Sequence, residues 1–158
     1  MTKILMVCLG NICRSPLAEG LMRHHLKQSE LHHVTIDSAG TSGWHIGEKP
    51  DKRTRANAAQ HDIDLNSLRA RQFTADDFSK FDKIFVMDAS NYRDVLSLAP
   101  SSEDAAKVDL LLNAIYPNEN RAVPDPYYGG EDGFEEVFQL VNAACERIAQ
   151  QLKTAHHE

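Results

Sequence analysis

The sequence is poor in cysteine and has no long hydrophobic run. Its 158 residues include three cysteines, Cys8, Cys13 and Cys145, and such an odd, sparse set is a poor disulfide framework that fits a reducing compartment. No stretch approaches the roughly 18 apolar residues of a membrane span. The N-terminal residues lead directly into a short apolar run instead of a signal peptide. We therefore expect a soluble cytoplasmic protein that does not bind membranes.

Positive charge is also scarce. Lys and Arg number 17 against 23 Asp and Glu, which gives a formal net charge of -6. A nucleic-acid-binding protein needs a basic face, so this balance argues against that class. The hydrophobic fraction of 42%, with 8 Gly and 6 Pro, is ordinary for a globular protein. The length suits one domain, 1–158, in which an anionic substrate would be held by local positive groups.

The apolar pattern predicts short strands that alternate with helices. In chain order we expect strands at 4–8, 34–36, 84–87 and 108–112, and helices at 17–27, 51–61, 90–98 and 134–152. This alternation indicates an α/β fold with a parallel sheet covered by helices on both faces. In such folds ligands bind beyond the carboxyl ends of the strands, and Cys8 lies at that end of the first strand.

Cys8 and Arg14 frame the most informative segment, C-L-G-N-I-C-R-S at 8–15. Amide groups of a tight loop and the N-terminus of the following helix form an anion cradle, in which a cysteine is expected to ionise to a nucleophilic thiolate. The Arg14 guanidinium matches two phosphate oxygens. Within the loop, Gly10 allows close backbone approach and Asn11 tolerates positive φ. We expect Ser15 both to cap the helix and to offer its hydroxyl to Cys8.

Asp125 is the candidate proton donor. Phosphoryl transfer to sulfur needs a proton for the departing oxygen, and Asp125 stands between two prolines and beside Tyr127 and Tyr128. Taken alone, each motif has a simpler explanation: a buried cysteine in a strand–helix turn with an unrelated arginine, and a Pro-Asp-Pro turn. Both motifs in one chain favour the catalytic interpretation.

Five segments together resemble the low-molecular-weight protein tyrosine phosphatases. They are V-C-L-G-N-I-C-R-S-P at 7–16, D-S-A-G-T at 37–41, A-R-Q at 70–72, M-D-A-S-N at 87–91 and D-P-Y-Y at 125–128. The resemblance implies a flavodoxin-like three-layer sandwich with a four-stranded parallel sheet. It also implies hydrolysis of phosphotyrosine through a phosphocysteine, without cofactor or metal.

The resemblance also implies roles for individual residues. Cys8 would be the nucleophile, Arg14 would bind phosphate, and Asp125 would act as general acid and then as general base. The phosphate-binding loop would comprise Leu9, Gly10, Asn11, Ile12, Cys13 and Ser15, supported by Ser38. The apolar entrance wall would comprise Leu9, Ile12, Trp44, Tyr127 and Tyr128. We expect Trp44, the only tryptophan, to be partly exposed because its neighbours are typical of a loop.

Two positions bear on regulation and on the loop's support. Cys13 is a candidate redox partner for Cys8, since a disulfide would protect the nucleophile from irreversible oxidation; the alternative is that Cys13 only packs beneath the loop. The family often has a histidine where this chain has Leu68, so the network around Asn11 and Ser38 is expected to be thinner. His61 matches a different family histidine.

Related activities on the same fold remain as alternatives. Protein-arginine phosphatases carry threonine at the position of Ile12, and thioredoxin-coupled arsenate reductases need two further cysteines that 84–98 does not contain. A non-catalytic phosphate-binding or redox-sensing module would need no proton donor such as Asp125. By resemblance, the partners would be tyrosine-phosphorylated proteins, a cognate bacterial tyrosine kinase among them, with inorganic phosphate as product.

The other polar residues are expected to have structural roles. Asp88 and Ser90 would cap a helix, with a secondary role for Asp88 near the site. Asp76 and Asp77 are interpreted as charges at a helix start, where the dipole favours them. Cys145 falls on the apolar stripe of the last helix and is expected to be inert core.

Overall fold

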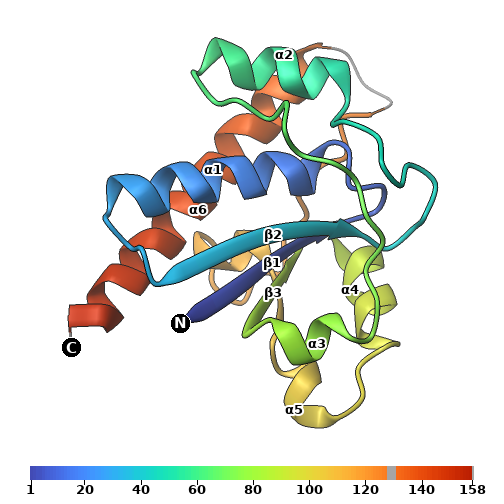
Figure 1. Cartoon of the computed structure of the whole chain (residues 1–158), viewed down its shortest axis with the longest axis vertical. Coiled ribbons are helices and arrows are strands. Elements are labelled where there is room, and N and C mark those ends of the chain that lie inside the picture. The colour runs from blue at the N-terminus through green and yellow to red at the C-terminus, as the bar shows by residue number, and fades with distance from the viewer. Residues whose placement is uncertain (128–130, 158) are drawn as a thin grey trace.

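The computed structural model describes residues 1–127 and 131–157 (Figure 1). Its sheet has four strands, all parallel, in the order β2-β1-β3-β4. The strands are β1 (Thr2–Cys8), β2 (Val34–Gly40), β3 (Lys83–Val86) and β4 (Val108–Leu110). Since β1 is central, its apolar run is buried on both faces, as expected for a parallel sheet. The flavodoxin-like α/β prediction is confirmed.

Helices cover both faces of this sheet (Figure 1). They are α1 (Arg14–Gln28), α2 (Lys52–Gln60), α3 (Asp77–Lys80), α4 (Ala89–Leu96), α5 (Ser102–Ala105), the 3₁₀ turn η1 (Leu111–Ala114) and α6 (Glu131–His157). Alternate residues of β1 serve opposite cores: Ile4 and Met6 pack with α1 and α6, whereas Leu5 and Val7 pack with Phe78 of α3. No helix in the described residues is long and apolar enough to cross a membrane.

The predicted fourth strand is too long. β4 ends at Leu110, and Leu111 and Leu112 lie in the 3₁₀ turn, where both are buried. Asp109 redirects the backbone, because its carboxylate accepts hydrogen bonds from the Leu110 N–H and the Asn113 side chain. A continuous apolar run serves the core equally well from a strand or from a tight turn, so periodicity does not locate the boundary.

Helix starts are set by local capping. The Asp51 and Asp88 side chains accept hydrogen bonds from Arg53 N and Asn91 N, and so begin α2 and α4. The predicted cap at Ser15 is wrong. α1 begins at Arg14, Cys13 occupies the N-cap without a side-chain hydrogen bond, and Ser15 lies inside the helix. Arg14 is therefore the first residue of the helix whose N-terminus faces the pocket.

Candidate active site

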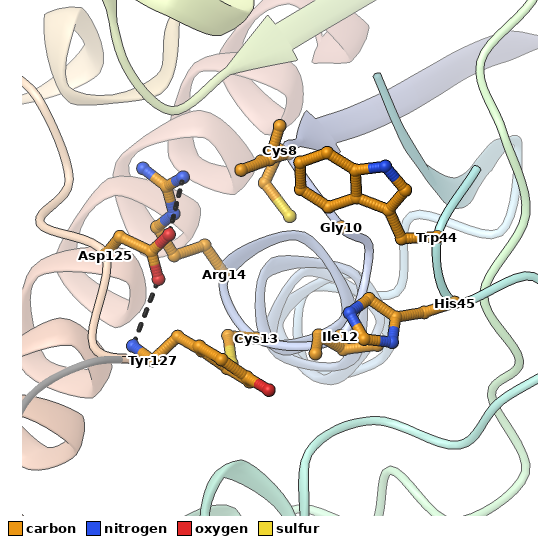
Figure 2. A pocket seen from close by; sticks show the side chains of 10 residues that line it. Cys8, Gly10, Ile12, Cys13, Arg14, Trp44, His45, Asp125 and Tyr127 are labelled. Carbon is orange, nitrogen blue, oxygen red and sulfur yellow. Dashed lines mark hydrogen bonds and ion pairs between the residues drawn. The ribbon is translucent and has the colours of Figure 1, made fainter. Parts of the chain in front are cut away.

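One pocket lies where β1 runs into α1 (Figure 2). It is lined by Cys8, Leu9, Gly10, Ile12, Cys13, Arg14, Trp44, His45, Asp125 and Tyr127. The structure thus brings together the predicted nucleophile, the predicted phosphate-binding arginine and the predicted acid, which are up to 117 positions apart in the sequence. In Figure 2 the Cys8 sulfur points into the space between Arg14 and Trp44.

The loop between β1 and α1 is held in an unusual conformation. Asn11 has φ of 57°, the left-handed region that its side chain tolerates, as predicted. Neighbouring backbone N–H groups bind loop carbonyls: Thr41 N donates to Cys8 O at 2.9 Å, Ser42 N to Leu9 O at 2.9 Å, and Asp51 N to Ile12 O at 2.7 Å. These bonds tie three carbonyl groups of 8–12 to the neighbouring segments and so hold the backbone conformation of the loop.

Cys8 is placed by a directed chain of hydrogen bonds. The Asn11 amide donates to Ser15 Oγ at 2.7 Å, which leaves the single Ser15 proton for another acceptor. Cys8 Sγ lies 3.0 Å from Ser15 Oγ, closer than the 3.4 Å to the Ala39 carbonyl. Ser15 therefore donates to the sulfur when Cys8 is a thiolate. This orientation stabilises negative charge on sulfur.

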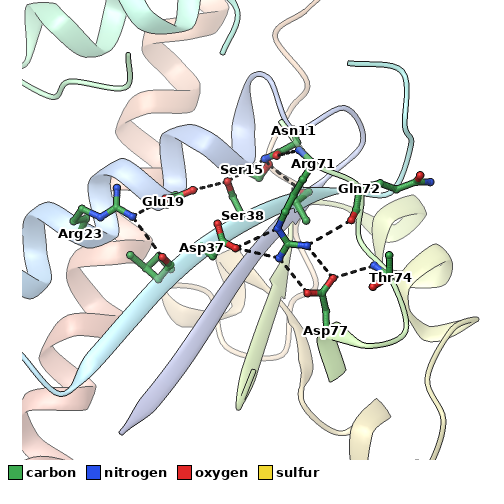
Figure 3. A network of polar contacts seen from close by, with 12 residues as sticks. Asn11, Ser15, Glu19, Arg23, Asp37, Ser38, Arg71, Gln72, Thr74 and Asp77 are labelled. Carbon is green, nitrogen blue, oxygen red and sulfur yellow. Dashed lines mark hydrogen bonds and ion pairs between the residues drawn. The ribbon is translucent and has the colours of Figure 1, made fainter. Parts of the chain in front are cut away.

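The same asparagine connects the loop to a buried carboxylate (Figure 3). Asn11 Nδ2 donates to Ser38 Oγ at 3.0 Å, and Ser38 donates to Glu19 Oε1 at 2.6 Å. Arg23 completes the chain with a 2.6 Å ion pair to Glu19. Burial raises the pKa of Glu19, while Ser38 and Arg23 oppose the rise. The sequence pattern predicts Ser38 but gives no sign of Glu19, which is buried among the apolar residues of α1.

A second arm of the network runs through Arg71 (Figure 3). Its backbone N–H donates to Asn11 Oδ1 at 3.0 Å, and its guanidinium bridges Asp37 on β2 and Asp77 on α3. Asp77 is buried and also accepts from Thr74 N. Asp77 is the first residue of α3, as the prediction of a charge at a helix start requires, but it also has a role that this prediction did not include. Its carboxylate is an internal partner of Arg71, which a local sequence pattern does not reveal.

Arg14 is buried and tightly held. Its side chain is 3% exposed, and Nη1 donates to Asp88 Oδ2 at 2.7 Å and to the Val123 carbonyl at 2.9 Å. Asp88 caps α4 through Oδ1, as predicted. Its other carboxylate oxygen, Oδ2, accepts the hydrogen bond from Arg14, which is the predicted secondary role near the site. Two separate loops thus fix the plane of the guanidinium, which is what two-pronged binding of phosphate requires.

Asp125 lies beside Arg14 on the same side of the pocket (Figure 2). Its Oδ2 lies 3.6 Å from Arg14 Nη2, and its Oδ1 accepts a hydrogen bond from Tyr127 N at 3.1 Å. The carboxylate side chain is 34% exposed, so it can reach both a bound ester and solvent. This geometry suits a group that exchanges a proton with a leaving oxygen and later with water.

The pocket mouth is apolar and open. Trp44 is 72% exposed, as expected for a loop residue, and it faces Arg14 and Asp125 from the opposite side (Figure 2). Leu9, Ile12 and Tyr127 also line the pocket as predicted. Tyr128, the last predicted wall residue, lies outside the described residues. His45, which no sequence motif indicates, lines the pocket beside Trp44 and pairs with Glu48 at 2.7 Å.

Comparison with known proteins identifies the relationship. A family model described as low molecular weight phosphotyrosine protein phosphatase matches residues 3–158. The chain belongs to this family. A low molecular weight protein-tyrosine-phosphatase of Streptomyces coelicolor is 47% identical over 145 residues, which cover 90% of this chain and 88% of the relative. The family is one of hydrolases that act on phosphotyrosine in proteins.

Solved structures of similar proteins share the fold. The protein tyrosine phosphatase of Entamoeba histolytica, solved with Hepes in the active site, gives a TM-score of 0.91 at 36% identity and covers 99% of each chain. A Drosophila protein described as an arginine phosphatase gives a TM-score of 0.88 at 33% identity, covering 96% of this chain and 98% of the other. Overall similarity of fold therefore does not separate a tyrosine phosphatase from a protein described as an arginine phosphatase.

The departure at Leu68 leaves the phosphatase loop connected. Leu68 is partly buried and packs against the core. His61 does not replace the missing histidine, because it stacks on Phe138 and binds Glu135 at 2.8 Å. Asn11 nevertheless uses both amide hydrogens and its carbonyl oxygen. The network that was expected to be thin is supplied by Glu19 and Arg71.

The other cysteines of this phosphatase differ from Cys8 in their surroundings. Burial raises the pKa of Cys13 to about 12, with smaller contributions from Asp51 and other negative groups. Cys145 is fully buried on α6, and burial raises its pKa as well, in agreement with the core role predicted for it. Both are therefore thiols at neutral pH, and neither competes with Cys8 for the phosphorus atom of a substrate.

Proposed function

We propose that this protein hydrolyses phosphotyrosine side chains of proteins through a covalent phosphocysteine on Cys8. The observation that carries the proposal is the convergence of the Cys8 sulfur, the buried Arg14 guanidinium and the Asp125 carboxyl on one pocket (Figure 2). Hydrolysis of a phosphate ester through a covalent intermediate requires a nucleophile, a group that binds the phosphate oxygens and a proton donor, and all three line this pocket.

In the first step the Cys8 thiolate attacks phosphorus and a sulfur–phosphorus bond forms. The bond between phosphorus and the tyrosine oxygen breaks, and its electron pair goes to that oxygen, which takes the proton from Asp125. Arg14 and the N–H groups of 9–15 bind the equatorial oxygens, where charge spreads in the transition state. Ser15 stabilises the thiolate, while Asn11 and Ser38 hold the loop.

In the second step Asp125, now a carboxylate, takes a proton from a water molecule as the water oxygen attacks phosphorus. The sulfur–phosphorus bond breaks and its electron pair returns to Cys8, which regenerates the thiolate. Inorganic phosphate leaves. Neither step needs an external oxidant, reductant or metal, since the proton given up by Asp125 is recovered from water.

The pocket wall favours an aromatic ester. Ile12, Leu9, Trp44 and Tyr127 offer apolar surface to a tyrosine ring, whereas a phosphorylated guanidinium would bury polar N–H groups against the branched side chain of Ile12. We propose on this ground that phosphotyrosine is preferred over phosphoarginine. A cognate bacterial tyrosine kinase is a natural substrate by resemblance, and we propose that 1–158 acts as one domain in the cytoplasm, where three free thiols are stable.

Steady-state kinetics with matched peptides test the function. One peptide sequence carrying phosphotyrosine, phosphoserine or phosphoarginine should give the highest kcat/KM for phosphotyrosine, and Cys8→Ser should abolish turnover. A folded Cys8→Ser protein with normal turnover would disprove the mechanism. Phosphate binding with negligible wild-type turnover would instead indicate a binding or redox-sensing module, and arsenate reduction with thioredoxin would indicate the reductase.

We also propose that Cys13 protects Cys8 during oxidation. Peroxide would oxidise the Cys8 thiolate to a sulfenic acid, whose sulfur the Cys13 sulfur attacks to form a disulfide, with loss of water. A dithiol would then restore both thiols. Cys13→Ser should therefore lose activity irreversibly under peroxide where the wild type recovers. If wild type and Cys13→Ser recovered their activity equally after peroxide and a dithiol, Cys13 would only pack beneath the loop.

A further inference from the structure

Arg53 lies at the start of α2, outside the pocket, yet it binds the segment that carries the proposed general acid. Its Nη2 donates to the backbone carbonyl of Tyr127 at 2.9 Å. The Tyr127 N–H in turn donates to Asp125 Oδ1 at 3.1 Å (Figure 2). A single residue therefore separates the Arg53 contact from the carboxyl group that must meet the leaving oxygen.

The guanidinium of Arg53 is held by four further contacts. Its Nε and Nη2 donate to the two carboxylate oxygens of Asp51, both at 3.1 Å. Its central carbon lies 4.7 Å from the ring centre of Phe134 and 5.4 Å from that of Tyr127, within the range of cation–π attraction. The group is thus oriented by a planar acceptor and by two rings.

Asp51 extends this connection to the nucleophile. Its backbone N–H donates to the Ile12 carbonyl at 2.7 Å, in the loop that carries Cys8. The first turn of α2 and its cap therefore touch both halves of the site: Asp51 contacts the phosphate-binding loop, and Arg53 contacts the segment that carries Asp125. The bidentate ion pair between Asp51 and Arg53 therefore fixes the position of the phosphate-binding loop relative to the segment that carries Asp125.

We propose that Arg53 is a positioning residue for the general acid, which it holds at a fixed distance from the Cys8 loop through Tyr127. Stability does not explain the arrangement, because the Arg53 side chain is 43% exposed and such ion pairs contribute little net free energy. Lysine would not substitute, since one ammonium cannot bind Asp51 with two prongs and also reach the Tyr127 carbonyl. The inference rests on the proposed acid role of Asp125.

Leaving-group dependence provides the test. Phenyl phosphate needs a proton on its leaving oxygen, whereas 2,4-dinitrophenyl phosphate does not. Misplacing the acid by an ångström costs up to about 100-fold, so Arg53→Ala should lower kcat/KM for phenyl phosphate by about 10- to 100-fold. The fall for the dinitrophenyl ester should be less than about threefold. Arg53→Lys should also lower the phenyl phosphate value, and Lys52→Ala, which removes an exposed neighbour with no polar contact among the described residues, should not.

A double-mutant cycle separates positioning from a general effect on structure. In the Asp125→Asn background, Arg53→Ala should change kcat/KM for phenyl phosphate by less than about twofold, because residues acting through one group are not additive. The proposal would be overturned if the effects of Arg53→Ala and Asp125→Asn on kcat/KM were fully additive. It would also be overturned if folded Arg53→Ala protein kept the wild-type ratio of kcat/KM between 2,4-dinitrophenyl phosphate and phenyl phosphate. If Asp125→Asn kept the wild-type ratio of kcat/KM between the two esters, the acid role of Asp125 would be refuted and the positioning role of Arg53 with it. Cys8→Ser tests the nucleophile independently.

Discussion

Gly40 ends β2 directly beneath the loop that carries Cys8, and its replacement by alanine is the sharpest test of how that loop is held. An added Cβ would lie 2.8 Å from the Leu9 carbonyl oxygen and 3.0 Å from both Asn11 N and the Gly10 carbonyl carbon. All three atoms are backbone, so no side-chain rotation relieves the contact. The loop itself must move away from β2.

The cost follows from two effects. Overpacking of a tight interior typically costs about 1–3 kcal/mol of stability. A displaced loop also misaligns N–H groups directed at the phosphate, and one hydrogen bond to a charged group is worth about 1.5–3 kcal/mol. Losing one such bond in the transition state lowers kcat/KM by about 10- to 150-fold. We therefore expect Gly40→Ala to combine a lower Tm with a marked loss of phosphate affinity.

The assay compares kcat/KM for p-nitrophenyl phosphate, the inhibition constants of phosphate and vanadate, and Tm. Gly20→Ala is the matched control, because its added Cβ also crowds the core but meets the end of the Leu65 side chain, away from the loop. Gly20→Ala should leave the inhibition constants unchanged. A folded Gly40→Ala protein with wild-type kcat/KM and wild-type phosphate inhibition would refute the reasoning.

Three further outcomes are expected. Asn11→Gly permits the positive φ but removes three hydrogen bonds, so kcat/KM should fall at least about tenfold; unchanged kinetics would show that only the backbone conformation matters. Hydrogen bonds from His61 and other neighbours lower the pKa of Glu135 to about 2 from 4.5, so the Tm advantage of wild type over Glu135→Gln should be complete above about pH 4.5 and vanish towards pH 2. Because the pKa of Cys13 is about 12, iodoacetate at pH 7 should modify Cys8 alone, as mass spectrometry of tryptic peptides can check.

The fold and the nucleophile loop could be predicted because their determinants are local. A short apolar run, a loop with Gly10 and Asn11, and a helix with its own apolar stripe specify a strand, a turn and a helix within 25 residues. The role of Asp125 could also be predicted, since its flanking prolines and tyrosines distinguish it from the other acidic residues. In each case the pattern and the structural element occupy the same stretch of sequence.

The supporting polar network could not be predicted because its partners are distant in sequence. Arg71 meets Asp77 nearby but also Asp37 on β2, and Arg53 meets Tyr127 across 74 positions. An isolated arginine or aspartate gives no periodic pattern, and a charged residue within a helix is by default expected at the surface. Glu19 shows the same limitation, since only the folded arrangement explains why a carboxylate is buried there.

The chain of hydrogen bonds from Arg23 through Glu19, Ser38 and Asn11 to Ser15 has a consequence for the history of the protein. The three inner members, Glu19, Ser38 and Asn11, each bind two others, so replacing any one of them leaves an unpaired polar group on either side. Few single substitutions at these positions should therefore be neutral. Substitutions here should be strongly epistatic, tolerated chiefly when a second change arrives with the first.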